Sequence, residues 1–170
     1  MSKSRVRRLV LIIHIIAGVA VIGDVWGLTL MHLQALGSAS PAAGQASFQF
    51  TTLMVFAGGV PFSLLSLSTG LVLVLLGKWG LRQAWILIKL CLQLGILATG
   101  ALFIAPILQA APRATDLSAL HREFLVLMAV QAVMLLTATV LAVFKPRWPR
   151  TRPPRRTDRQ SPPPATGVGA

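Results

Sequence analysis

The stretch LVLIIHIIAGVAVIGDVWGLTLMHL, residues 9–33, is almost free of charge over a length that can cross a bilayer. A transmembrane helix needs about 20 predominantly apolar residues, because the hydrocarbon core of a membrane is about 30 Å thick. Three more runs of this kind follow along the chain, at about 53–76, 84–108 and 124–144. Within the four runs only Asp24 and Lys89 carry formal charge. We therefore predict an all-α fold, an integral membrane bundle of four helices.

The overall composition agrees with this prediction. Of the 170 residues 55% are hydrophobic and only 12% are charged, and a soluble domain this small could not bury so much apolar surface. The basic segment KSRVRR before the first run also fits a cleaved signal peptide, but the apolar run is long for one and no clean cleavage site follows. The single cysteine, Cys91, excludes an intramolecular disulfide.

The basic residues are distributed unevenly along the chain. Of 16 lysines and arginines, four precede the first run, two lie between the second and third runs, and seven follow the fourth. This asymmetry matches the positive-inside rule for a bacterial cytoplasmic membrane, with both termini in the cytoplasm. It explains the net charge of +12 without nucleic-acid binding.

The chain divides into a membrane domain, residues 1–145, and a tail, residues 146–170. The tail is rich in proline and arginine and poor in aliphatic residues, so we predict that it is disordered. Its arginines would lie near the inner leaflet, where each basic residue gains about 1 kcal/mol from anionic lipid. Three tryptophans flank the runs at the predicted inner interface and favour the headgroup region, namely Trp79, Trp85 and Trp148.

Small residues at helical spacing predict where the helices approach one another. In lipid, helices associate through small and polar residues rather than through hydrophobicity. The residues concerned are Gly23 and Gly27, then Ser63, Ser66 and Gly70, and finally Gly95 and Thr99. Pro61 should kink the second helix, because its ring and missing N–H interrupt the hydrogen-bond ladder.

The three histidines lie at two separate levels of the predicted bundle. His14 and His32 are 18 residues apart, which is five helical turns, so they share one helix face about 27 Å apart. His121 precedes the fourth run on the same predicted outer side as His32. Imidazoles from two helices can hold a metal ion, so His32 and His121 are candidate metal ligands. The alternative is that both are solvated interface residues.

Other polar residues lie inside the runs. Lys89 matches His14 in depth, and His14 is a candidate cofactor-binding residue; alternatively His14 bonds a backbone carbonyl and Lys89 extends to the surface. Asp24 matches the depth of Gln131, which predicts a hydrogen bond between them. A carboxylate in a membrane helix is costly and usually faces the bundle interior. Whether Asp24 is ionised stays open.

The stretch VPFSLLSLSTGLVLVLLGKWGLRQAWILIKLCLQLGI, residues 60–96, follows a first helix of the form H-x(11)-W-G-x(4)-H. Together they resemble a bacterial family of small integral membrane proteins of unknown function, distantly similar to copper-resistance protein D. The resemblance covers about residues 9–108 and implies a four-helix membrane fold. Wider relatives include copper-uptake proteins and a haem-pathway oxidase with a first-helix histidine, which His14 would match. Asp24 departs from the pattern, which has a small or apolar residue there.

No catalytic constellation is visible in the sequence: there is no nucleophile–base set, no pair of carboxylates and no phosphate-binding loop. We therefore predict a non-enzymatic membrane protein with a metal- or haem-linked role. The alternative is a small transporter or accessory subunit in which Asp24 and Lys89 line a polar path. The identity of any cofactor, and whether the chain forms a homo- or hetero-oligomer, are left open.

Overall fold

The computed structural model describes residues 2–38, 40–77 and 83–144. The predicted tail, two of the three predicted interfacial tryptophans and the basic residues between the second and third runs lie outside these ranges; the single residues concerned are Lys78, Trp79, Arg82 and Trp148.

The described part of the chain is helical throughout, with no strand. In chain order its elements are α1 (Lys3–Gly37), α2 (Pro41–Met54), the π-helical turn η1 (Val55–Gly59), α3 (Val60–Leu76), α4 (Ala84–Thr99), a second π-helical turn η2 (Gly100–Ile104), α5 (Ala105–Ala110), the 3-10 turn η3 (Ala111–Arg113) and α6 (Leu117–Phe144). In this part, four helical stretches are long and apolar enough to cross a membrane: Lys3–Gly37, Pro41–Leu76, Ala84–Arg113 and Leu117–Phe144. The fold supports assignment as a multi-pass membrane protein.

Each predicted run lies inside one of these helices, but the helices are longer than the runs. Much of the segment between the first two predicted runs, residues 34–52, is helical, because α2 already begins at Pro41. Ser40 caps this helix by accepting from the Ala43 N–H at 3.4 Å, and proline is well suited to the first helical position. Asp116 caps α6 in the same way, accepting from the Ser118 N–H at 2.8 Å. The Ser118 hydroxyl and N–H hold the pKa of Asp116 below its usual range.

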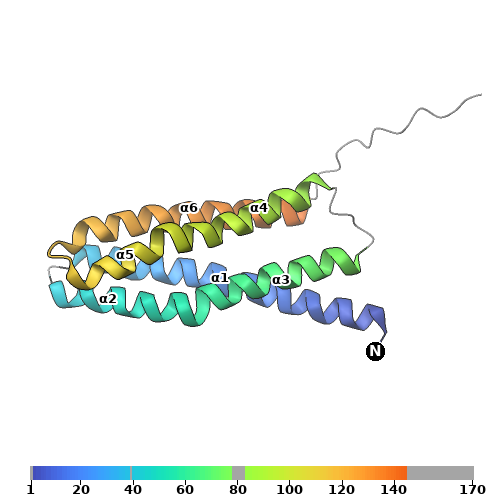
Figure 1. The fold of residues 1–170 in the computed structure, drawn as a ribbon, viewed down its shortest axis with the longest axis horizontal. Helices are drawn as coiled ribbons and strands as arrows, with labels where there is room; N and C mark the ends of the chain where they lie inside the picture. The colour runs from blue at the N-terminus through green and yellow to red at the C-terminus, as the bar shows by residue number, and fades with distance from the viewer. Residues whose placement is uncertain (1, 39, 78–82, 145–170) are drawn as a thin grey trace, which may run out of the picture.

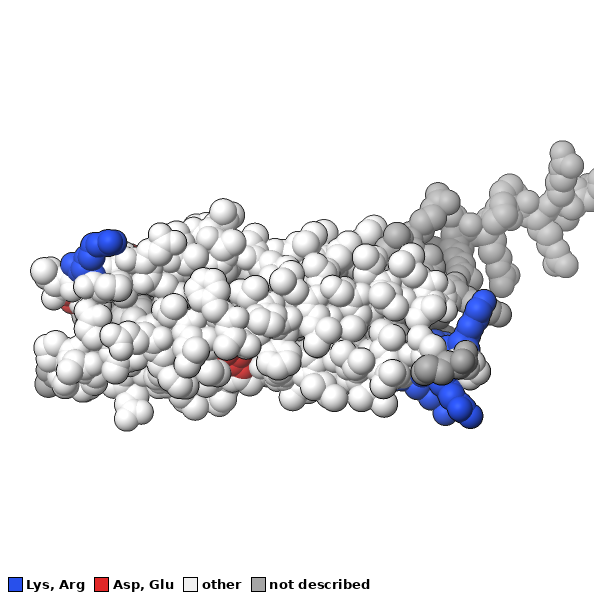
Figure 2. Space-filling model, turned by 60° about the horizontal axis from the view of Figure 1, so that its bottom comes forward, with Lys and Arg blue, Asp and Glu red and all other residues white. Residues whose placement is uncertain are grey.

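The helices form an elongated bundle (Figure 1). One end, which we call the hairpin end, holds the connections α1–α2 and α5–α6; the other, the N-terminal end, holds the start of α1 and the end of α6. Charged side chains gather at the two ends, and between them the visible face is uncharged except for one acidic spot (Figure 2). This distribution suits a bundle whose middle lies in hydrocarbon.

Helix α1 is central to the packing and contacts α2, η1, α3 and α6. Its buried face carries Val21, Val25 and Leu28, which join Phe124 and Met128 of α6 in the core. Large apolar side chains also cover the outside of the bundle, Trp26 for example being 65% exposed. Such a surface is stable in lipid but not in water.

Each π-helical turn ends two residues before a proline. The Val60 N–H bonds the Val55 carbonyl, and the Ala105 N–H bonds the Gly100 carbonyl, each five residues back. Pro61 and Pro106 follow directly. A proline ring clashes with the carbonyl four residues before it, and the wider turn relieves that clash. The interruption expected at Pro61 is therefore present as a π-helical turn.

The small residues behave unequally. Ser63 and Ser66 are buried, Gly70 lies against the His14 ring, and the Met134 methyl packs directly on Gly95. Gly23 and Gly27, in contrast, are exposed and meet nothing within 4 Å. The prediction that this glycine pair packs inside the bundle is wrong, because the buried face of α1 lies on the opposite side of the helix.

Candidate functional site

The candidate site is a pair of histidines near the hairpin end, which we call the histidine pair: His32 of α1 and His121 of α6. Their Nδ1 atoms are 2.7 Å apart, which is a hydrogen bond between the two rings. The side chains are 0% and 2% exposed. The predicted meeting of these two residues is confirmed, and the alternative that both are solvated interface residues is wrong.

Thr51 of α2 fixes the direction of this hydrogen bond. Its hydroxyl donates to the Ser47 carbonyl at 2.8 Å, so its oxygen accepts from the Nε2–H of His32 at 2.7 Å. His32 is then a neutral imidazole whose Nδ1 accepts a hydrogen bond from the Nδ1–H of His121. The chain of hydrogen bonds ties three helices together at one level of the bundle.

This assignment leaves one nitrogen without a partner. The Nε2 of His121 is buried and makes no hydrogen bond with any described residue. It faces α2 at Gly44, where an added Cβ would lie 3.3 Å from Nε2 and 3.0 Å from the Leu117 side chain. Glycine at this position lets α2 approach the ring closely.

Two phenylalanines enclose the histidine pair. The ring of Phe124 stacks on His32 at 4.0 Å between centroids, and the ring of Phe48 stacks on His121 at 4.5 Å. Both phenylalanines are buried. The site is therefore apolar around its polar centre, which strengthens any electrostatic interaction formed there.

The protein supplies few ligands besides these two imidazoles. Within residues 2–38, 40–77 and 83–144, no group of three or more histidine, cysteine, aspartate or glutamate side chains could hold a metal ion. The two rings offer two nitrogens, and a metal bound there would use them in place of the shared proton. This donor set suits an ion that imidazole binds well, such as copper or zinc, at low coordination number.

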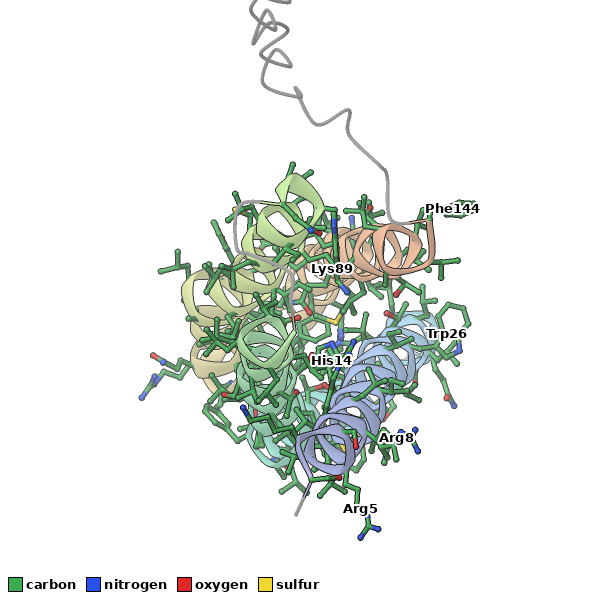
Figure 3. All side chains as sticks on the ribbon, turned by 90° about the vertical axis from the view of Figure 1, so that its right-hand side faces the viewer. Arg5, Arg8, His14, Trp26, Lys89 and Phe144 are labelled. Carbon is green, nitrogen blue, oxygen red and sulfur yellow. The ribbon has the colours of Figure 1, made fainter. Side chains whose placement is uncertain are left out.

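The remaining histidine, His14 of α1, lies toward the N-terminal end of the bundle. His14 Nδ1 is 3.0 Å from the Ser66 carbonyl and 3.1 Å from the Thr69 hydroxyl oxygen, so its N–H donates to α3. The alternative of a bond to a backbone carbonyl is confirmed. The charge of Lys89 acts on the His14 ring, as their equal predicted depth suggested. Figure 3 shows both residues in the interior, whereas Arg5 and Arg8 point outward.

Asp24 and Gln131 are not hydrogen-bonded to each other, so that prediction is wrong. Gln131 of α6 donates to the Ile96 carbonyl of α4 at 3.3 Å. Asp24 instead faces η1, and its Oδ1 has no hydrogen-bond partner among residues 2–38, 40–77 and 83–144. Equal depth was the basis of the prediction, but Gln131 bonds α4 whereas Asp24 packs on η1.

Sequence reasoning missed the residues that surround the histidine pair. Thr51 falls between the first two predicted runs, although it lies four residues after Ser47 on a helix that begins with Ser-Pro. Phe48, with its ring against His121, belongs to the same turn. The Ser-Pro start was the signal available in the sequence, since it marks a helix N-terminus.

In comparisons with known proteins, no family model, no curated protein and no solved structure matches this chain. The resemblance to the family related to copper-resistance protein D therefore stays a prediction.

Proposed function

We propose that this chain is a non-enzymatic membrane protein whose histidine pair binds a transition-metal ion. The observation that carries the proposal is the meeting of two neutral imidazoles from different helices, with their Nδ1 atoms 2.7 Å apart in a buried site. A metal-binding histidine usually donates its other N–H to a neighbouring oxygen, which fixes the ring. His32 makes such a bond to Thr51.

Binding requires a small opening of the pair. With metal–nitrogen bonds of about 2.0 Å, two nitrogens on a tetrahedral ion lie roughly 3.3 Å apart, and on a linear ion about 4 Å apart. The imidazoles would thus separate by roughly 0.6 to 1.3 Å from their hydrogen-bonded position. In His121 the proton would move from Nδ1 to Nε2, so that both rings stay neutral. Side-chain rotation covers shifts of this size.

The experiment measures metal bound to the purified full-length protein. Cu(I) and Zn(II) are titrated against a chromophoric chelator for the unaltered chain and for His32→Ala, His121→Ala and His14→Ala. We expect one ion per chain in the unaltered protein and in His14→Ala, and at least a hundredfold weaker binding in the other two. Equal binding by all four proteins, or no binding by the unaltered chain, would refute the proposal.

The charge distribution supports an orientation with both termini in the cytoplasm of a bacterial cell. The basic residues of α1 lie before its apolar stretch, at Lys3, Arg5, Arg7 and Arg8. Such residues stay on the cytoplasmic side, where they also meet anionic lipid of the inner leaflet. In this orientation the histidine pair lies toward the outer face and His14 toward the inner one.

A second candidate function is a small transporter or accessory subunit that uses Asp24 and Lys89. The observation that favours it is the presence of polar groups inside the bundle at several depths, with Lys89 beside His14 and Asp24 without a partner. Asp24→Asn and Lys89→Met variants separate the two functions. Metal binding at the histidine pair should not change in either variant. Transport that uses Asp24 and Lys89 should be lost in both.

A further inference from the structure

Asp24 lies near the middle of α1 and packs on two glycines of η1. A Cβ built at Gly59 would lie 2.8 Å from the carboxylate Oδ2, and one built at Gly58 would lie 3.7 Å from Oδ1. Real Cβ atoms essentially never come as close as the first distance, so a side chain at Gly59 would displace the carboxylate. The glycine pair gives the carboxylate direct access to the backbone of this turn.

No ionisable side chain of the described residues pairs with Asp24. Helices α2 and α3 and the turn η1, residues 41–76, contain none at all. On α1 the nearest are His32 and His14, eight and ten residues away, which is about 12 and 15 Å along the axis, and both bond other groups. On the neighbouring α6, Gln131 donates to α4 instead. The carboxylate therefore stands without a donor in a part of the bundle that would lie within the membrane.

The turn beside Asp24 supplies further acceptors and no spare donor. Val60 donates to the Val55 carbonyl, five residues back. Pro61 has no N–H, so the carbonyl it would otherwise bond, that of Phe56 or Ala57, lacks its helical donor. Unpaired acceptors held away from water are costly unless a proton or a cation binds them. Interrupted membrane helices bind sodium ions and protons through such freed carbonyls.

We propose that Asp24 and the η1 turn form a binding site for an exchangeable monovalent cation, either a proton or an alkali-metal ion. The ligands on the protein side are the carboxylate of Asp24 and backbone carbonyl oxygens of η1. Asp24 is partly buried, and its Oδ1 is a buried atom. Figure 2 shows one acidic spot on the side of the bundle between the charged ends. This site lies apart from the histidine pair and does not depend on metal binding there.

The test uses dicyclohexylcarbodiimide, which modifies protonated carboxyl groups in apolar surroundings. The full-length protein in liposomes is treated over a range of pH in choline, sodium or potassium chloride at equal ionic strength, and mass spectrometry locates the modification. We expect modification of Asp24 that slows as the pH rises and is absent in Asp24→Asn. At least tenfold protection by sodium or potassium relative to choline identifies an alkali-metal ion; dependence on pH alone identifies the proton.

Two variants test whether η1 is part of the site. Gly59→Ala displaces the carboxylate, and Pro61→Ala restores an N–H for the freed carbonyl. Each variant should shift the pH midpoint of Asp24 modification by at least one pH unit or change the protection by sodium or potassium at least tenfold. The matched controls are Gly100→Ala and Pro106→Ala at η2, where an added Cβ at Gly100 meets nothing within 4 Å; they should behave as the unaltered protein.

The proposal is overturned if Asp24 resists modification at every pH, or reacts at one rate in all conditions. It is also overturned if both η1 variants keep the profile of the unaltered protein. Circular dichroism and size-exclusion chromatography report folding. If Gly59→Ala fails to fold, Pro61→Ala alone decides between the two outcomes.

Discussion

Replacing Thr51 with valine tests the hydrogen-bond chain that fixes the histidine pair. Valine keeps the shape of the side chain but removes the hydroxyl, which is fully buried and accepts from the Nε2–H of His32. The donor of His32 is then left without an acceptor. If both rings exchange tautomers, a lone pair of His32 faces the valine methyl instead. Either state leaves a buried polar group unpaired, which costs about 1–3 kcal/mol.

The neighbouring residue provides the control. Thr52 donates only to the Phe48 carbonyl of its own helix, at 2.9 Å, and its side chain is exposed. Thr52→Val should therefore change stability by no more than about 0.5 kcal/mol. The free energy of unfolding is measured by titration with sodium dodecyl sulfate in mixed micelles. For a chain of this size, about 1 kcal/mol corresponds to roughly 2–4 °C in Tm, which gives an independent measurement.

Equal stability of the Thr51→Val and Thr52→Val proteins would show that Thr51 does not hold the His32 ring. A second readout separates this outcome from a general packing effect. Nitrogen-15 NMR of labelled histidine reports which ring nitrogen carries the proton, and we expect Nε2 for His32 and Nδ1 for His121. In Thr51→Val that pattern should be lost or mixed.

Three further predictions concern the rest of the molecule. Metal binding at the histidine pair should weaken as the pH is lowered, because protons compete with the metal ion for the imidazole nitrogens; an affinity by chelator competition that stays constant over the whole pH range in which the protein is folded would exclude these ligands. Reporter fusions after residues 40 and 115 should read as periplasmic and those after 80 and 150 as cytoplasmic, and the opposite pattern would reverse the orientation. Gly95→Leu should lower stability by about 1–3 kcal/mol, because the Met134 methyl already occupies that space, whereas Gly23→Leu on the open face of α1 should be close to neutral in the same unfolding titration.

The sequence was sufficient to predict the four helices, because length and apolarity decide what can cross a membrane. It was also sufficient to bring His32 and His121 to one end, since the order of the helices fixes which ends are neighbours. It did not fix rotation about each helix axis. Gly23 and Gly27 have the spacing of a contact motif, yet they face outward, because His32 and the core residues of α1 select the opposite face.

Hydrogen-bond partners were the least predictable feature. Equal depth suggested that Asp24 would meet Gln131, but depth is one coordinate of three. Gln131 turns to the Ile96 carbonyl, and Asp24 turns to a glycine pair whose importance depends on the π-helical turn around it. A π-helical turn before a proline changes which side of the helix a carbonyl faces, and that change is not visible in hydrophobic periodicity.

Three polar side chains of α1 face different partners along its length. His14 bonds α3, Asp24 faces η1, and His32 bonds both α2 and α6. Association of helices in lipid gains little from burying apolar surface, so such contacts contribute directly to the choice of neighbours. His14 makes hydrogen bonds through one ring nitrogen and His32 through both, and these bonds hold α1 in place. Of these three residues only Asp24 makes no such bond within the part of the chain that the structure describes, and the proposed cation site rests on this difference.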